Sequence, residues 1–160
     1  MSTTIMRAAI LFALILSVVT VSVYVVGNPS GISGSDYTWR QQAMTRALNI
    51  PTPIVGSVTI ALALTSVGLN WSRLGTRWLL IAGALLFISA GLITRLYNQP
   101  INAIVMTWDP SAPPPDWQRL RDDWWHWHVG RTLSIVAGLI FLVAGYIFEK
   151  RSMSAHRDKT

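Results

Sequence analysis

The sequence predicts an all-α fold: an integral membrane four-helix bundle with an extended loop between the third and fourth helices and a long final helix. Four unbroken apolar runs approach the roughly 20 residues that a helix needs to cross a bilayer. Only 12% of the 160 residues are charged, about half the share in a soluble domain. Basic residues stand at the ends of the apolar runs. One membrane domain accounts for all three observations.

The net charge of +6 raises the question of a nucleic-acid partner. The position of the basic residues argues against it, because arginine and lysine beside apolar runs are typical of a cytoplasmic surface with anionic lipid. The expected partner is therefore the lipid bilayer, and no signal specifies an oligomeric state. The chain has no cysteine, which excludes disulfides, thiolate nucleophiles, iron–sulfur clusters and cysteine-ligated zinc or haem. Nothing in the sequence demands a metal, haem or flavin cofactor.

The first span is predicted over residues 8–26, an apolar run that follows a short basic head. A cleaved signal peptide is the alternative interpretation. The run is longer than the ~7–15 residues of a signal h-region, and no small-residue cleavage site follows it. We therefore expect a retained helix, ended by Gly27, Asn28 and Pro29.

Residues 30–49 form the first polar connection. We expect a short helix here, capped by Ser35 or Asp36. It would either lie along the lipid headgroups, with Tyr37 and Trp39 at the interface, or form a lid over the functional stretch described below. The residues that share one face of this predicted helix are Tyr37, Arg40, Met44, Ala47 and Leu48.

The other three spans are predicted over residues 53–69, 78–94 and 132–148. Pro51 and Pro53 open the second span, because the first turn of a helix does not need the missing proline N–H. A short basic turn over residues 70–77 leads into the third span. Gly83 and Gly91 in that span leave room for close packing against another helix.

Four spans place both termini on one side of a cell membrane. Arg7, the 70–77 turn and the basic tail favour the cytoplasm for that side. His156 in the tail is expected to be solvated. The stretch over residues 95–131 would then lie outside the membrane and face outwards.

The 95–131 stretch concentrates the residues that can do chemistry. Pro100 disfavours helical geometry at Gln99, so we expect the chain to leave the helix there. Asn98 and Asn102 would then satisfy loop backbone or orient a bound molecule. A short apolar helix could follow before the prolines of the loop.

The final helix is predicted to begin after Asp116 as N-cap and to run without a break to Phe148, about 50 Å at 1.5 Å per residue. Trp124 of this helix and Trp108 of the loop are the candidates for lining an aromatic pocket. The helix residues that fall along one stripe are Trp117, Leu120 or Arg121, Trp124, His128, Arg131 and Ile135.

His128 is the sharper of two histidine candidates. It could move a proton, ligate a metal or bind a phenol or quinone, or it could simply bond a loop carbonyl, Asn98 or Asn102. His126 lies about 200° away around the helix, so the two cannot chelate one ion, and we expect it to pair with Asp122. Arg131 could hold an anionic or enolate oxygen, or its side chain could snorkel to the membrane surface.

These residues resemble the signature of the anthrone oxygenase-like family of small four-helix membrane proteins. The resemblance covers roughly the last two-fifths of the chain, and the first two spans agree with the family in hydropathy. The matching elements are Asn98, Pro100 and Asn102, an acidic proline-containing loop over residues 109–116, Leu120 and Arg121, and then Trp124, His128, Arg131 and Thr132.

The resemblance implies an oxygenase that converts an anthrone-like or phenol-like substrate to a quinone without a cofactor. His128 would be the base and Arg131 would hold the oxyanion. Two other hypotheses stay open: a non-catalytic structural or partner-binding module, and a haem protein with His128 or His126 as axial ligand. The residues expected to bind the substrate are Asn98, Asn102, Trp108, Arg121 and Trp124.

Overall fold

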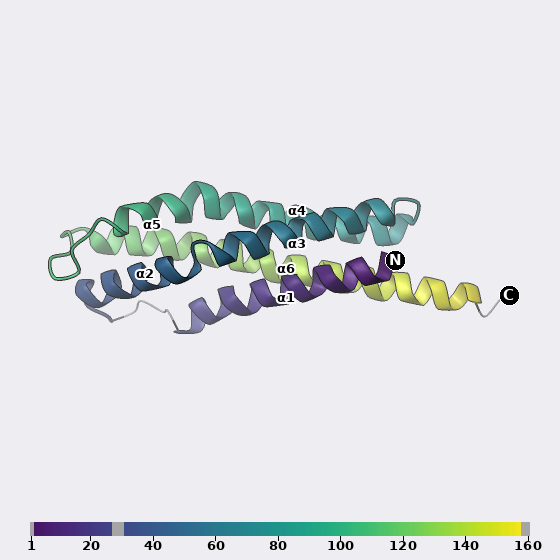
Figure 1. Ribbon diagram of the computed structural model, residues 1–160, viewed down its shortest axis with the longest axis horizontal. Helices are drawn as coiled ribbons and strands as arrows, with labels where there is room; N and C mark the ends of the chain where they lie inside the picture. Colours follow the sequence, from purple (N-terminus) through teal and green to yellow (C-terminus); the bar gives the residue numbers. More distant parts are fainter. Residues whose placement is uncertain (1, 27–30, 158–160) are drawn as a thin grey trace.

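Four long helical rods lie side by side in the computed structural model, which describes residues 2–26 and 31–157 (Figure 1). Two of the rods are composite: α2 leads into α3, and α4 leads through a π-helix, η1, into α5. The elements are α1 (Ser2–Val26), α2 (Gly34–Leu48), α3 (Pro51–Leu69), α4 (Leu74–Ile93), η1 (Thr94–Asn98), α5 (Gln99–Val105) and α6 (Trp117–Arg157).

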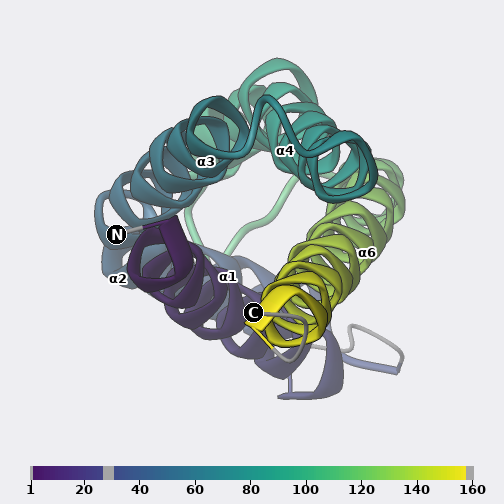
Figure 2. The ribbon, with the colours of Figure 1, turned by 90° about the vertical axis from the view of Figure 1, so that its right-hand side faces the viewer.

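Viewed along its length, the bundle is a four-sided ring in which α1, α3, α4 and α6 each contact two neighbours (Figure 2). The start of α1 and the end of α6 lie at the same end of the bundle. All four predicted spans fall within helices that are long and apolar enough to cross a membrane. The predicted membrane four-helix bundle is therefore confirmed. The predicted stop at residues 27–29 and the side chain of His156 lie outside the described residues.

Small residues let α4 and α6 approach closely, as membrane helices without a hydrophobic driving force require. A Cβ atom added at Gly83 would lie 3.2 Å from the carbonyl oxygen of Gly138, and one at Gly138 would lie 3.0 Å from the Phe87 ring. The close packing expected at Gly83 is therefore present. At Gly91 it is not, because an added Cβ would meet only the Cδ1 atom of Ile60, at 3.8 Å.

The chain does not leave the helix at Pro100, so that prediction was wrong. The N–H of Gln99 bonds the carbonyl of Thr94, five residues earlier, and Gln99 keeps helical angles. A proline ring normally crowds the carbonyl four residues before it. The wider π turn just ahead of Pro100 gives the ring room, and such bulges are often found at functional sites. The extended loop is confined to residues 106–116.

The α2 helix differs from its prediction in both cap and buried face. Ser33 is the N-cap, and its hydroxyl oxygen accepts from the N–H of Asp36 at 3.1 Å. Of the predicted face only Tyr37 is buried, and Arg40, Ala47 and Trp39 are exposed. The buried residues are Tyr37, Thr38, Gln41, Gln42 and Thr45. This face is polar because α2 packs on the backbone carbonyls at the end of α5, a contact that hydropathy does not register.

The final helix begins directly after Asp116, as predicted. It continues past the predicted end at Phe148 to Arg157, so its 41 residues extend about 60 Å at 1.5 Å per residue. The predicted stripe is confirmed, since Trp124, His128 and Ile135 are all buried. At the far end of α6, the buried carboxylate of Glu149 pairs with Arg73 and accepts from Thr76 Oγ1.

Candidate functional site

A cavity of about 430 Å³ lies inside the half of the bundle away from the two termini, with lining residues from every rod. One part of its wall is apolar and is formed by Leu16, Ile60, Phe87 and Ile135. The other part is polar and is formed by Asn49, Thr94, Gln99, Asn102 and Arg131. This mixture of apolar surface with a few convergent polar groups is typical of small-molecule sites.

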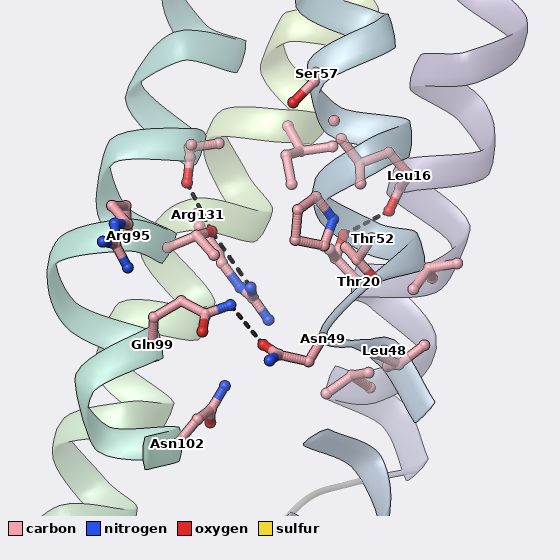
Figure 3. A pocket seen from close by; sticks show the side chains of 18 of the residues that line it. Leu16, Thr20, Leu48, Asn49, Thr52, Ser57, Arg95, Gln99, Asn102 and Arg131 are labelled. Carbon is pink, nitrogen blue, oxygen red and sulfur yellow. Dashed lines mark hydrogen bonds between the residues drawn. The ribbon is translucent and has the colours of Figure 1, made fainter. Parts of the chain in front are cut away.

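Arg131 projects from α6 into the cavity (Figure 3). Its Nε and Nη2 atoms lie 3.1 and 2.9 Å from Nδ1 of His128, and Nη1 donates to Thr94 Oγ1 at 3.4 Å. Within residues 2–26 and 31–157 it forms no ion pair, and none of the cavity-lining residues there is acidic. A guanidinium offers five N–H donors, so this cation has neutral partners and spare donors for an anion.

His128 is fully buried, with 0% exposure. Its ring stacks on Trp124, with centroids 4.9 Å apart. A guanidinium can only donate, so Nδ1 of His128 must accept and the ring proton lies on Nε2. Nε2 has no hydrogen-bond partner among the described residues. The imidazole does not line the cavity itself, whereas Trp124 and Arg131, which contact it, do.

Asn102 ties the cavity to α2. Its Oδ1 atom accepts from Trp124 Nε1 at 2.8 Å and from Gln41 Nε2 at 2.9 Å. Within the part of the chain that the structure describes, the N–H groups of its amide donate to no residue, and in Figure 3 the amide nitrogen is the atom turned towards Gln99. Gln42 fastens α2 further, because its Nε2 donates to the carbonyls of Val105 and Trp108. The helix over residues 34–48 therefore covers the end of the site, as the lid interpretation requires.

Of the expected site residues, Asn102, Trp124 and Arg131 meet at the cavity. Asn98 is buried behind it and donates to the carbonyl of Trp124 at 3.0 Å. Trp108 packs in the apolar cluster under α2. Arg121 donates to Asp122 at 2.8 Å and lies over the Trp117 ring.

His126 is exposed and meets the Trp127 ring edge-on. The expected pairing with Asp122 was wrong: among the described residues the two form no ion pair, and the Asp122 carboxylate accepts from Arg121 instead. Residues of the described chain include no group of three histidines or acids that could hold a metal ion.

Sequence reasoning missed the polar residues that approach from other elements. Gln99 Nε2 donates to Asn49 Oδ1 at 2.7 Å and so joins α5 to the α2–α3 junction (Figure 3). Gln41 and Thr94 hold Asn102 and Arg131. The sequence did carry one signal for Gln99. Gly91, Arg95 and Gln99 are four residues apart, so they share one helix face.

The bundle and its cavity define a small multi-pass membrane protein with an internal amphiphilic site. The family model for anthrone oxygenases matches residues 39–141, well over half of the chain. The chain belongs to the anthrone oxygenase family. The match starts within α2 and runs into α6, so it includes the second predicted span, which resembled the family in hydropathy alone, and leaves out the first. No curated protein and no solved structure matches the chain.

Proposed function

We propose that this protein is a membrane oxygenase that oxidises a small, apolar, anthrone-like or phenol-like substrate with molecular oxygen. The observation that carries the proposal is Arg131, a guanidinium with no acidic partner among the described residues, facing a cavity with an apolar wall. A buried cation without a counter-charge is costly. A ligand that brings an anionic oxygen on an apolar ring system would offset this cost.

The proposed reaction balances without a further reductant. An anthrone and one O₂ give an anthraquinone and one water. The ring methylene loses two hydrogens and gains one oxygen atom, and the second oxygen atom leaves in the water. Loss of a proton turns the anthrone into an electron-rich phenolate, which can pass electrons to O₂. The chain must therefore hold the anion and accept a proton.

Arg131 would bind the phenolate oxygen, and the free amide N–H groups of Asn102 would bind a second oxygen of the ring system. The ring of Trp124 would pack against the substrate. His128 is proposed as the base. Because its Nδ1 accepts from Arg131, the guanidinium must turn towards the substrate oxygen before Nδ1 can take a proton. Substrate binding would thus free the base.

The test is oxygen uptake and quinone formation by purified protein in lipid vesicles supplied with a dihydroxyanthrone. Arg131→Gln keeps the hydrogen-bonding character of the position and removes the charge. Arg119→Gln is the control, since Arg119 is exposed and pairs with Asp116 away from the cavity. Turnover by wild type and control but not by Arg131→Gln supports the proposal. If the wild type does not turn over, the hypothesis of a non-catalytic module is favoured. A Soret band in the absorption spectrum of the purified protein would favour the haem hypothesis.

We also propose that both termini are cytoplasmic and that the cavity lies towards the outer surface of the cell membrane. Support comes from the basic residues near the C-terminal end of α6 and from Arg7 and Arg73, which bond to Tyr146 and Glu149 of that same helix. Clustered basic residues favour the cytoplasmic side.

A further inference from the structure

The cavity opens through the side of the bundle, between α3 and the α4–η1 rod. The cavity-lining residues of α1 and α6 are all buried or half-buried. The exposed ones are Asn49, Pro53 and Ser57 on one side and Gly91 and Arg95 on the other. Each set steps by four residues, so each forms one edge along a helical rod. Together the two edges frame a slot, which we call the α3–α4 slot.

Two glycines leave space unfilled along this slot. A Cβ atom added at Gly56 would meet nothing within 4 Å, and one at Gly91 would meet only Ile60. On the α4–α6 side, by contrast, an added Cβ at Gly138 would lie 3.0 Å from a neighbouring ring. The glycines at the slot therefore leave space open, whereas Gly83 and Gly138 bring α4 and α6 close together.

The slot faces lipid along most of its length. Pro53, Ser57 and Gly91 all lie within helices that can cross a membrane. Large apolar side chains beside the slot, Ile54, Leu92 and Leu96, are exposed on the same rods. Exposed apolar residues on a membrane helix indicate contact with lipid chains.

One end of the slot is polar. The hydrogen bond from Gln99 to Asn49 crosses from one rod to the other at 2.7 Å. Arg95, one turn before Gln99, has no ion pair among the described residues. An amide pair and a cation at the end of an otherwise apolar opening suit a flat apolar molecule with one polar edge.

We propose that the α3–α4 slot is a lateral entrance through which a flat, apolar hydroxyarene passes from the bilayer into the cavity, with Arg95 and the Asn49–Gln99 pair binding its polar edge. This inference rests on the proposed function for the identity of the ligand. The molecule crosses the lipid as the neutral phenol, because an anion is costly in hydrocarbon. Its hydroxyl group ionises after it reaches Arg131.

The absence of cysteine in the chain makes a clean test possible. A single cysteine replaces Ser57 at the slot, and in the control it replaces Thr65, exposed on the same helix two turns further on and away from the cavity. Each variant, in vesicles, is compared before and after reaction with a bulky lipid-soluble maleimide. Binding of a dihydroxyanthraquinone is followed by tryptophan quenching, and oxidation of a dihydroxyanthrone by oxygen uptake.

Modification of Ser57→Cys should slow binding and oxidation by about tenfold or more, within the range that a gated step removes from an association rate. Modified Thr65→Cys should match its unmodified form. A second pair of variants replaces glycines. Gly91→Leu fills the slot and should slow binding and oxidation. Gly68→Leu is its control, because it adds the same side chain to α3 at a position where an added Cβ meets nothing within 4 Å.

Slot-dependent binding without oxidation would support the entrance and overturn the oxygenase. Oxidation that neither slot modification nor Gly91→Leu changes would overturn the entrance and leave the oxygenase standing. Failure of the wild type to bind the quinone at all would overturn the entrance as proposed.

Discussion

Arg131 donates to a single atom of His128, Nδ1, from both Nε at 3.1 Å and Nη2 at 2.9 Å. The two residues are three apart on α6, so one turn of helix fixes the pair. The pairing gives the imidazole one tautomer and leaves Nη1 facing Thr94. A base and an anion-binding group are thereby coupled, because the guanidinium cannot turn fully to a ligand without releasing Nδ1.

Replacement of His128 by Asn and by Ala separates these two roles. Asparagine keeps an acceptor for Arg131 but supplies no base, so His128→Asn should retain quinone binding and lose about 10²–10⁴ in turnover, the usual contribution of a general base. His128→Ala should lose both. Binding is measured by tryptophan quenching and turnover by oxygen uptake. Turnover near the wild-type rate in His128→Asn would remove the base role and leave His128 as a residue that positions Arg131.

A negative charge at Asn102 should block anion binding without loosening the fold. Asn102→Asp keeps an acceptor for Trp124 and Gln41 but places a carboxylate at the cavity that Arg131 lines. Quinone binding should fall sharply while the thermal midpoint stays close to wild type. Asn102→Ala should instead lower stability by about 1–3 kcal/mol, the cost of leaving buried donors unpaired. Unchanged quinone affinity in Asn102→Asp would contradict the placement of the anion.

Tyr37→Phe should stabilise the protein. The Tyr37 hydroxyl is buried without a hydrogen-bond partner among the described residues. Removing such a group raises the free energy of unfolding by on the order of 1 kcal/mol. Burial also raises the pKa of the Tyr37 phenol well above its ordinary value. Above about pH 10 the unfolded chain therefore loses a proton that the folded chain keeps, and stability falls as pH rises.

Thermal unfolding in detergent at neutral and alkaline pH measures both effects for Tyr37. The alkaline loss should be smaller in Tyr37→Phe than in wild type, and Tyr24→Phe, at an exposed ring, serves as the control. Equal alkaline losses in all three proteins would show that Tyr37 does not titrate in this way.

Breaking the ion pair at the far end of the bundle should affect stability alone. Glu149 is 2% exposed and pairs with Arg73, so Arg73→Gln leaves a buried carboxylate uncompensated, at a cost of about 3–5 kcal/mol. Arg151→Gln, at an exposed position on the same helix as Glu149, should change little. The thermal midpoint checks this prediction, and the rate per folded protein should not move because the pair is remote from the cavity.

Single cysteines test the orientation. Ser111, in the loop before α6, and Ser152, near the C-terminal end of α6, are both exposed. Each is replaced by cysteine in a separate variant. In intact cells a membrane-impermeant maleimide should label the first and not the second. The reverse pattern would place both termini outside and the loop in the cytoplasm.

The sequence alone determined the membrane bundle, the four spans, the start of the last helix and the buried stripe through Trp124, His128 and Ile135. These features follow from local patterns: a run of apolar residues reports burial in lipid, and a spacing of three or four reports a helix face. The same stripe put Arg131 next to His128, because their separation on α6 is fixed by one turn.

Only the tertiary structure decided which of those residues share a cavity and which side of the bundle is open. Asn102 depends on Gln41 of α2, and Gln99 depends on Asn49, partners that lie tens of residues away and that no periodicity connects. The helix through Pro100 and the polar buried face of α2 also went against local preference. For α2 the carbonyls at the end of α5 supply hydrogen-bond partners that the segment by itself lacks. At Pro100 the room comes from the π turn just ahead of it, which the spacing of apolar residues does not report.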